Sequence, residues 1–241
     1  PRFVDFGKLL QALFSIVLFG LTGYLYGAFT FYDRIAWNLG LRRGPKPVFF
    51  LLAVLLLLVS FPLEEWLGEL NKQIPLWHWM LRTEDSNDRL VDAFLKVRHP
   101  LDPVINVLVM AAIPAFCEEI CFRGALQRVL IQICKHPWAG IIVTAFLFSF
   151  FHFEFQGFIP RMFLGLLLGA AYWYSGSLWV SILAHFVFNG VQIVVAMANP
   201  GVVSKNASIP LLIVLFSIVL VVGLLGWMRR RSTVTFASVY E

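Results

Sequence analysis

The sequence predicts an all-α membrane protein, a polytopic bundle of about seven transmembrane helices with an interfacial helical insert between the second and third. Hydrophobic residues make up 59% of the 241 residues and charged residues only 14%. A soluble domain has about a quarter of its residues charged. The mean hydropathy is +0.79, and the apolar residues fall in long runs. We therefore treat residues 1–241 as a single integral membrane domain.

Seven apolar runs reach the length of a transmembrane helix, which is about 17–25 residues. They are residues 9–32, 47–63, 105–133, 137–153, 158–174, 178–198 and 209–228. The first run is too long for the core of a signal peptide, so we interpret it as a spanning helix. Because the chain begins at Pro1, we expect the native start to lie before it.

Residues 64–100 form a polar insert between the second and third runs. Its segments LEEWLGEL and RLVDAFLKV have apolar residues at helical spacing, and PLWHWM is rich in tryptophan. Amphipathic helices and tryptophan rings favour the interface between lipid and water. We expect interfacial helices here that connect the spans, with a lid or substrate-gathering role as the alternative.

The net charge of +5 does not indicate nucleic-acid binding, because the basic residues lie in short patches between apolar runs. Seven alternating spans put one set of patches on the same side of the membrane: Arg34, Arg42, Arg43, Lys46, Arg128, Lys135 and residues 229–231. Compact basic patches beside spans favour the cytoplasmic side. We therefore expect a cytoplasmic C-terminus, in the cytoplasmic membrane if the source is bacterial.

A few polar side chains lie inside the predicted spans. They are Glu118, Glu119, Arg123, His152, His185 and Asn189. An ionisable group at the centre of a span costs about 2.5–3.5 kcal/mol on insertion scales, so such groups are hypotheses about function by default. Cys117 and Cys121, on one helix face, are interpreted as packing thiols.

The spacing of these residues predicts which of them meet. Glu119 and Arg123 are four residues apart and can form an ion pair on one helix face, which leaves Glu118 free for another task. Glu118 lies 17 residues before Lys135 and His152 lies 17 after it. If the chain turns at Lys135, both lie roughly 25 Å from the turn, so a contact between them is permitted.

These residue types are suited to hydrolysis. A carboxylate beside an imidazole in a partly dry site can activate a water molecule. His185 and Asn189, four residues apart, can point donors at a developing oxyanion, and each such donor is worth roughly 3–4 kcal/mol when water is excluded. Ser149 and Ser181 also lie in the spans, but neither is surrounded by the GxSxG pattern of a nucleophile.

Three motifs occur in order on the third, fourth and sixth predicted spans. Residues 118–123 read EExxxR, residues 148–152 read FxxxH and residues 185–189 read HxxxN. Together they resemble the CAAX prenyl endopeptidase and bacteriocin-processing (CPBP, or Abi) family of intramembrane proteases. The resemblance covers about residues 105–198, so we assign residues 101–200 as the catalytic core.

The resemblance implies glutamate-dependent peptide hydrolysis within a helical bundle. Glu118 matches the water-activating glutamate, and His152 the histidine that helps to hold or deprotonate that water. His185 and Asn189 match the oxyanion-stabilising pair, with Glu119 and Arg123 as a structural ion pair. The implied partners are the lipid bilayer and a membrane-associated peptide or protein substrate, which in some relatives carries a lipidated C-terminal cysteine.

Four other interpretations remain open. Glu118, His152 and His185 are acceptable zinc ligands, although HExxH is absent, and we favour a site without a metal cofactor. The polar residues can also serve as a buried network that holds helices together. A proton-coupled transporter and a non-catalytic immunity or scaffold protein are the remaining alternatives. Phe148 is assigned to packing.

Overall fold

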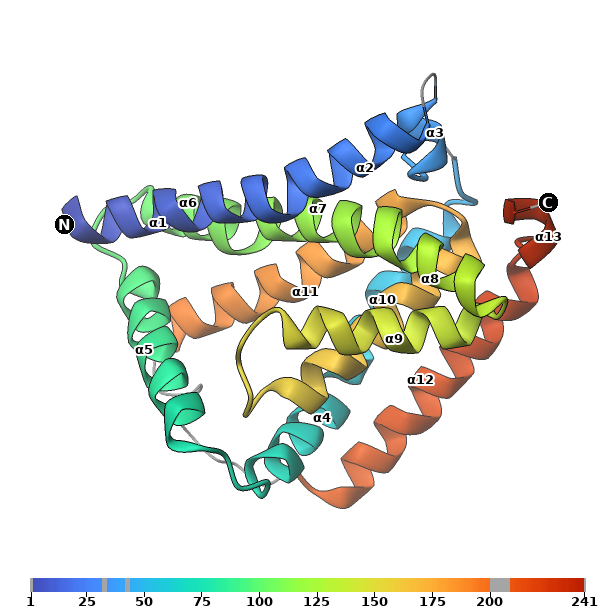
Figure 1. Cartoon of the computed structure of the whole chain (residues 1–241). Coiled ribbons are helices and arrows are strands. Elements are labelled where there is room, and N and C mark those ends of the chain that lie inside the picture. The colour runs from blue at the N-terminus through green and yellow to red at the C-terminus, as the bar shows by residue number, and fades with distance from the viewer. Residues whose placement is uncertain (1, 32–33, 42–43, 200–208, 241) are drawn as a thin grey trace.

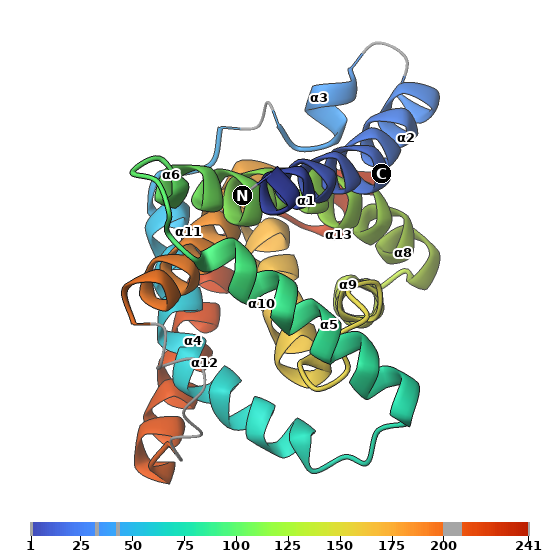
Figure 2. The ribbon, with the colours of Figure 1, turned by 90° about the vertical axis from the view of Figure 1, so that its left-hand side faces the viewer.

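The computed structural model describes residues 2–31, 34–41, 44–199 and 209–240, and these residues form helices and no strand (Figures 1 and 2). The expected all-α class is confirmed. Five described helices are long and apolar enough to cross a membrane, and Pro137–Phe150 forms a shorter apolar helix. The expected integral membrane protein is thus supported. Tyr32, Arg42 and Arg43, which belong to the predicted first span and basic patches, lie outside the described residues.

The first span is a continuous helix that packs along the helix carrying the two glutamates (Figure 1). It consists of α1 (Arg2–Phe14), the π-helical segment η1 (Ser15–Leu21) and α2 (Thr22–Thr30). The two helices approach closely at Gly23, where a Cβ atom would lie only 2.7 Å from Ile120 Cγ2. Small residues allow such close contact between helices in lipid. The short helix α3 (Ile35–Asn38) follows.

The second span, α4 (Val48–Lys72), is longer than predicted. The segment 63–70, expected as a separate interfacial helix, continues α4, so that part of the prediction is wrong. The helix continues past Pro62, and Ser60, Leu63 and Glu64 are buried. The Ser60 hydroxyl donates a hydrogen bond to Glu64 Oε1 over 2.5 Å, which gives the buried carboxyl group a partner.

The remainder of the polar insert forms one amphipathic helix, α5 (His78–Leu95). It lies across the end of the bundle at which α4 ends and α6 begins (Figure 2). Among its residues only Glu84 and Phe94 are buried. Phe94 packs close to Gly7 of α1, and α5 also contacts α6 and α11.

The third and fourth spans form a tight hairpin. One continuous helix comprises α6 (Asp102–Val107), η2 (Leu108–Ala112), α7 (Ile113–Glu119), η3 (Ile120–Leu126) and α8 (Gln127–Cys134). The chain turns at Lys135, which has a φ of +54°, and the His136 ring caps the next helix by accepting from the Ala139 N–H group over 3.4 Å. The helix α9 (Pro137–Phe150) then runs back along α8.

The centre of the bundle is α10 (Phe158–Ser175), which packs against α4, α9, α11 (Leu178–Ala198) and α12 (Leu211–Arg231). Its sequence of small residues permits this central position: a Cβ atom at Gly165 would lie 3.1 Å from the Ala145 Cα atom of α9. The longest run of buried residues in α10 is Leu167–Tyr174, interrupted by no exposed position.

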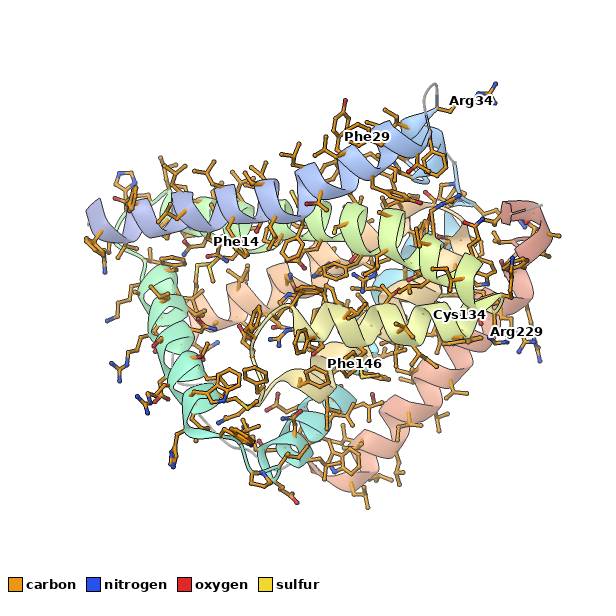
Figure 3. All side chains as sticks on the ribbon, in the orientation of Figure 1. Phe14, Phe29, Arg34, Cys134, Phe146 and Arg229 are labelled. Carbon is orange, nitrogen blue, oxygen red and sulfur yellow. The ribbon has the colours of Figure 1, made fainter. Side chains whose placement is uncertain are left out.

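The outer helices expose apolar side chains, as lipid-facing helices do. On α12, Leu212 is 78% exposed and Val219 is 66% exposed. Figure 3 shows Phe29 pointing away from the bundle, while Arg34 and Arg229 lie at the end where α2 and α12 finish. Water would not tolerate this much continuous apolar surface, whereas a bilayer covers it. The short C-terminal helix α13 (Phe236–Tyr240) follows α12 and lies beside the labelled C-terminus (Figure 1).

Candidate active site

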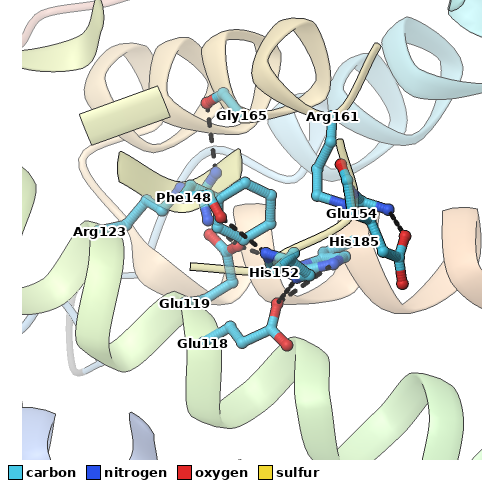
Figure 4. Close-up of polar contacts among 9 residues, drawn as sticks. All are labelled: Glu118, Glu119, Arg123, Phe148, His152, Glu154, Arg161, Gly165 and His185. Atoms are coloured by element: carbon cyan, nitrogen blue, oxygen red, sulfur yellow. Dashed lines mark hydrogen bonds and ion pairs between the residues drawn. The ribbon is translucent and has the colours of Figure 1, made fainter. Parts of the chain in front are cut away.

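Glu118 and Glu119 lie where the α7 backbone widens into the π-helical segment η3. A second π-helical segment, η2, precedes α7. Short π-helical turns inside α-helices frequently occur at functional sites. Glu118 is 6% exposed and Glu119 is fully buried, so both carboxyl groups need partners (Figure 4).

Glu119 has two partners from different spans. Its Oε1 atom accepts from Arg123 Nη1 over 2.6 Å and lies 3.0 Å from His185 Nδ1. Arg123 is also fully buried, donates from Nη2 to the Gly165 carbonyl over 3.2 Å, and lies 4.4 Å from the centre of the Phe148 ring. The pair expected from the sequence is thus present in the geometry, with His185 as a third member.

His152 lies just beyond the end of α9, beside Glu118. Its Nδ1 atom lies 2.6 Å from the Phe148 carbonyl oxygen, and its Nε2 atom lies 3.6 Å from Glu118 Oε2. Because a carbonyl oxygen only accepts hydrogen bonds, we assign the proton to Nδ1. In the neutral ring the Nε2 lone pair therefore faces Glu118.

His185 approaches the same carboxylate oxygen from α11. Its Nε2 atom lies 4.0 Å from Glu118 Oε2, and its Nδ1 proton is assigned by the contact with Glu119. Two imidazole Nε2 atoms and one carboxylate oxygen thus converge at distances longer than a direct hydrogen bond. Polar groups at such distances commonly share a bridging water molecule.

Asn189 lies one helical turn beyond His185 on α11 and lines the same cavity as Glu118, His152 and His185. The cavity has a volume of about 1170 Å³ and extends between α1, α4, α5, α10 and α11. The structure therefore brings together all four residues predicted to act on a substrate, with Glu119 and Arg123 directly behind His185.

Some features of the site were missed by sequence reasoning. The contact between Glu119 and His185 joins residues that are 66 positions apart, and no local spacing signals it. Glu64 also lines the cavity, although its segment was assigned to the interface. The spacing of four between Ser60 and Glu64, on an apolar helix, is the signal that could have indicated a buried acid.

A zinc ion would require closer ligands than these. Two ligands about 2.0–2.1 Å from a tetrahedral zinc ion lie roughly 3.4 Å apart. The Glu118 Oε2 atom lies 3.6 Å from one imidazole nitrogen and 4.0 Å from the other. Throughout the described part of the chain, no three side chains of His, Cys, Asp or Glu are arranged to hold a metal ion. The residues do not fit zinc as they stand. A metal-free site stays a prediction.

The fold and the site together define a class: a polytopic helical membrane protein with a polar, hydrolase-like cluster inside its bundle. Residues 100–191, which contain all three motifs, match the protein-family model described as type II CAAX prenyl endopeptidase Rce1-like. A Bacillus subtilis (strain 168) protein named "Uncharacterized protein YpbD" is 29% identical over 90 residues, which cover 36% of this chain and 43% of that protein. No solved structure matches the chain.

Residues 100–191 are thus similar to the Rce1-like family of type II CAAX prenyl endopeptidases. The resemblance inferred from the motifs is thereby confirmed. The chain spans under half the length of the curated relative that it matches. The segment matched by the family model leaves α1–α5, α12 and α13 outside it.

Proposed function

We propose that this protein is an intramembrane endopeptidase that hydrolyses a peptide bond of a membrane-associated peptide or protein. The observation that carries the proposal is the convergence of the His152 and His185 Nε2 atoms on Glu118 Oε2, over 3.6 and 4.0 Å, in the wall of a cavity. The similarity of residues 100–191 to the Rce1-like family model supports an endopeptidase of the CAAX type. The roles of the individual residues are derived below from their contacts.

The charges of the buried cluster favour a mobile proton. Glu118 and Glu119 bring two carboxylates, and Arg123 brings one fixed positive charge. One further proton, shared among Glu118, His152 and His185, makes the cluster neutral, which a site of low dielectric constant favours. General acid–base catalysis needs such a proton within reach of the reacting atoms.

In the first step, Glu118 acts as the general base. The His152 ring is held by the Phe148 carbonyl, so its Nε2 atom accepts a hydrogen bond from the attacking water and orients it. The water transfers one proton to the Glu118 carboxylate, and its oxygen forms a bond to the carbonyl carbon of the substrate. The carbonyl π electrons move to oxygen and give a tetrahedral oxyanion.

His185 and Asn189 stabilise this oxyanion. The Asn189 amide donates from Nδ2, and His185 donates from Nε2 when its ring is protonated. Glu119 accepts the Nδ1 proton of His185 over 3.0 Å and so stabilises the imidazolium form. Donors of this kind are worth about 2.7–4 kcal/mol each in a site that excludes water.

In the second step, Glu118 acts as the general acid. Its carboxylic acid donates the proton to the leaving nitrogen, the C–N bond breaks, and the oxyanion electrons reform the carbonyl group. The products are a carboxyl terminus and an amine, and the Glu118 carboxylate is restored. The sequence of steps forms no covalent enzyme intermediate, because water is the nucleophile.

The position of the cavity favours a membrane-associated substrate. Four of the helices that bound it, the first span, α4, the helix of residues 102–134 and α11, are long and apolar enough to cross a bilayer. Aromatic side chains such as Phe61, Phe148 and Phe188 line it. An extended peptide held near the lipid by a hydrophobic or lipidated residue can reach such a site. Cleavage close to a lipidated C-terminal cysteine is the version of this proposal that the family suggests.

Purified protein incubated with a library of membrane-associated peptides tests the proposal. We expect cleavage that produces a new carboxyl terminus and a new amino terminus, and we expect Glu118→Ala to abolish it. Glu69→Ala, a substitution at an exposed glutamate paired with Lys72, is the control and should cleave normally. Cleavage that survives Glu118→Ala would remove the assignment, and a protein that binds peptides without cleaving them would favour a scaffold.

A further inference from the structure

His152 lies in a loop rather than in a regular helix. α9 ends at Phe150, and residues 151–157 lead to the start of α10. Phe153, directly after His152, has a φ of +53°, a left-handed conformation that is uncommon for a residue other than glycine. The direction in which His152 points therefore depends on the contacts that hold this loop.

The end of α4 supplies one such contact. Asn71 is 2% exposed, and both ends of its amide group bind the loop backbone. Its Nδ2 atom donates to the Phe155 carbonyl over 2.7 Å, and its Oδ1 atom accepts from the Ile159 N–H group over 2.8 Å. A single side chain thus bridges the loop from the residue 155 carbonyl to the first turn of α10.

The interfacial helix α5 supplies the other contact. Glu84 is 7% exposed although most of its helix is exposed, and its Oε1 atom accepts from the Gln156 N–H group over 2.5 Å. Trp79, five residues before Glu84 on α5, packs edge-on against the Phe155 ring with 5.3 Å between ring centres. Burying a carboxyl group is costly unless it is hydrogen-bonded, so the bond from the Gln156 N–H group offsets the cost of burying Glu84.

Two further polar contacts join the loop to the helices that it connects. Ser149 of α9 donates to the Phe158 carbonyl over 2.6 Å, and Arg161 of α10 pairs with Glu154. Asn71 and Glu84, in contrast, anchor the loop to α4 and α5, which lie 72–88 residues earlier in the chain.

We propose that Asn71 and Glu84 are positioning residues, which hold the loop of residues 151–157 and the first turn of α10 so that His152 Nε2 faces Glu118. Both residues lie outside the segment that matches the family, residues 100–191. The polar insert would then complete the active site in addition to connecting two spans. This inference deepens the proposed function and rests on it, because it assigns residues that act through His152.

Hydrogen exchange of the intact protein in detergent or nanodiscs tests the anchoring without any need for activity. Asn71→Leu and Glu84→Met each remove a partner of a backbone amide, so the Ile159 and Gln156 amides should exchange about tenfold faster or more. Gln73→Leu makes the same change at an exposed neighbour and should leave the loop protected. Unchanged exchange of the loop in both Asn71→Leu and Glu84→Met would overturn the inference.

Kinetics then distinguish positioning from general stability. Displacing a catalytic group by about 1 Å can lower the rate about 10²-fold, so kcat should fall on that scale while KM stays within about threefold. Glu84→Gln keeps an oxygen acceptor for the Gln156 amide and should restore most of kcat. In a His152→Ala background, Asn71→Leu should lower the residual rate no further, because the residue through which it acts is gone.

The outcomes separate the two proposals. A loosened loop with an unchanged kcat, or an equal loss of rate with and without His152, would overturn the positioning role and leave the endopeptidase proposal standing. If the unsubstituted protein hydrolyses no peptide, the proposed function fails, and with it the catalytic meaning of the positioning role. The exchange of the loop would still decide whether Asn71 and Glu84 hold it.

Discussion

Removal of the Glu119 carboxylate is a severe test of the buried network. Glu119→Ala takes away the group that accepts from Arg123 Nη1 over 2.6 Å and contacts His185 Nδ1 over 3.0 Å. The guanidinium of Arg123 keeps its positive charge in proteins. Because Arg123 has no exposed surface, that charge would be buried without the Glu119 carboxylate. Breaking a buried ion pair by removing one partner destabilises a protein by about 3–5 kcal/mol.

The expected change is large enough to measure by thermal unfolding. For a chain of this length, each kcal/mol shifts the melting temperature by roughly 2–4 °C, so Glu119→Ala should lower it by about 6–20 °C. The assay is unfolding of purified protein in detergent, followed by tryptophan fluorescence at a fixed scan rate. Glu69→Ala removes an exposed i,i+3 partner of Lys72, and such an exposed pair contributes at most about 1 kcal/mol. This control should therefore shift the melting temperature by no more than about 4 °C.

A second substitution checks the physical reason. Glu119→Ala combined with Arg123→Met removes the stranded charge, so the double variant should recover more than half of the lost stability. A melting temperature for Glu119→Ala equal to that of the unsubstituted protein would refute the reasoning. The absence of recovery in the double variant would show that the loss comes from packing or from His185.

Two further predictions concern the chemistry. Asn189→Ala should lower kcat about 10²–10³-fold with little change in KM, because an oxyanion donor acts in the transition state; a rise in KM with kcat unchanged would contradict that role. Extensive treatment with a zinc chelator should leave peptide hydrolysis intact, because Glu118, His152 and His185 do not fit a tetrahedral ion as they stand. Activity that is lost on chelation and restored by zinc alone would reverse the choice of mechanism.

Local patterns in the sequence were sufficient to predict much of this site. The pair Glu119 and Arg123 follows from a spacing of four within one helix, and that pair is present in the geometry. The closeness of Glu118 to His152 follows from their equal distances from Lys135, because consecutive antiparallel helices keep the same depth. The presence of the long helices was predictable for a different reason. An apolar run of this length has few stable forms in a bilayer other than a helix.

Contacts between non-consecutive helices were not predictable in this way. The contact between Glu119 and His185 depends on how α7 packs against α11, which follows it in the sequence only after two further spans. The binding of the His152 loop by Asn71 and Glu84 depends on where α4 ends, and the sequence prediction ended that helix too early at Leu63. A polar residue at the membrane interface can face water, lie among lipid headgroups or be buried against the protein. The amino-acid composition of such a segment therefore does not reveal which of its residues are buried.

The most direct test of the central claim is the single-turnover rate of Glu118→Gln on a peptide that the unsubstituted protein cleaves. Glutamine keeps the size and hydrogen-bonding ability of the side chain but cannot accept the proton of the attacking water. The account predicts a rate lower by about 10²–10⁴-fold, with substrate binding and melting temperature close to normal. A rate within tenfold of the unsubstituted protein would contradict the assignment of Glu118 as the base.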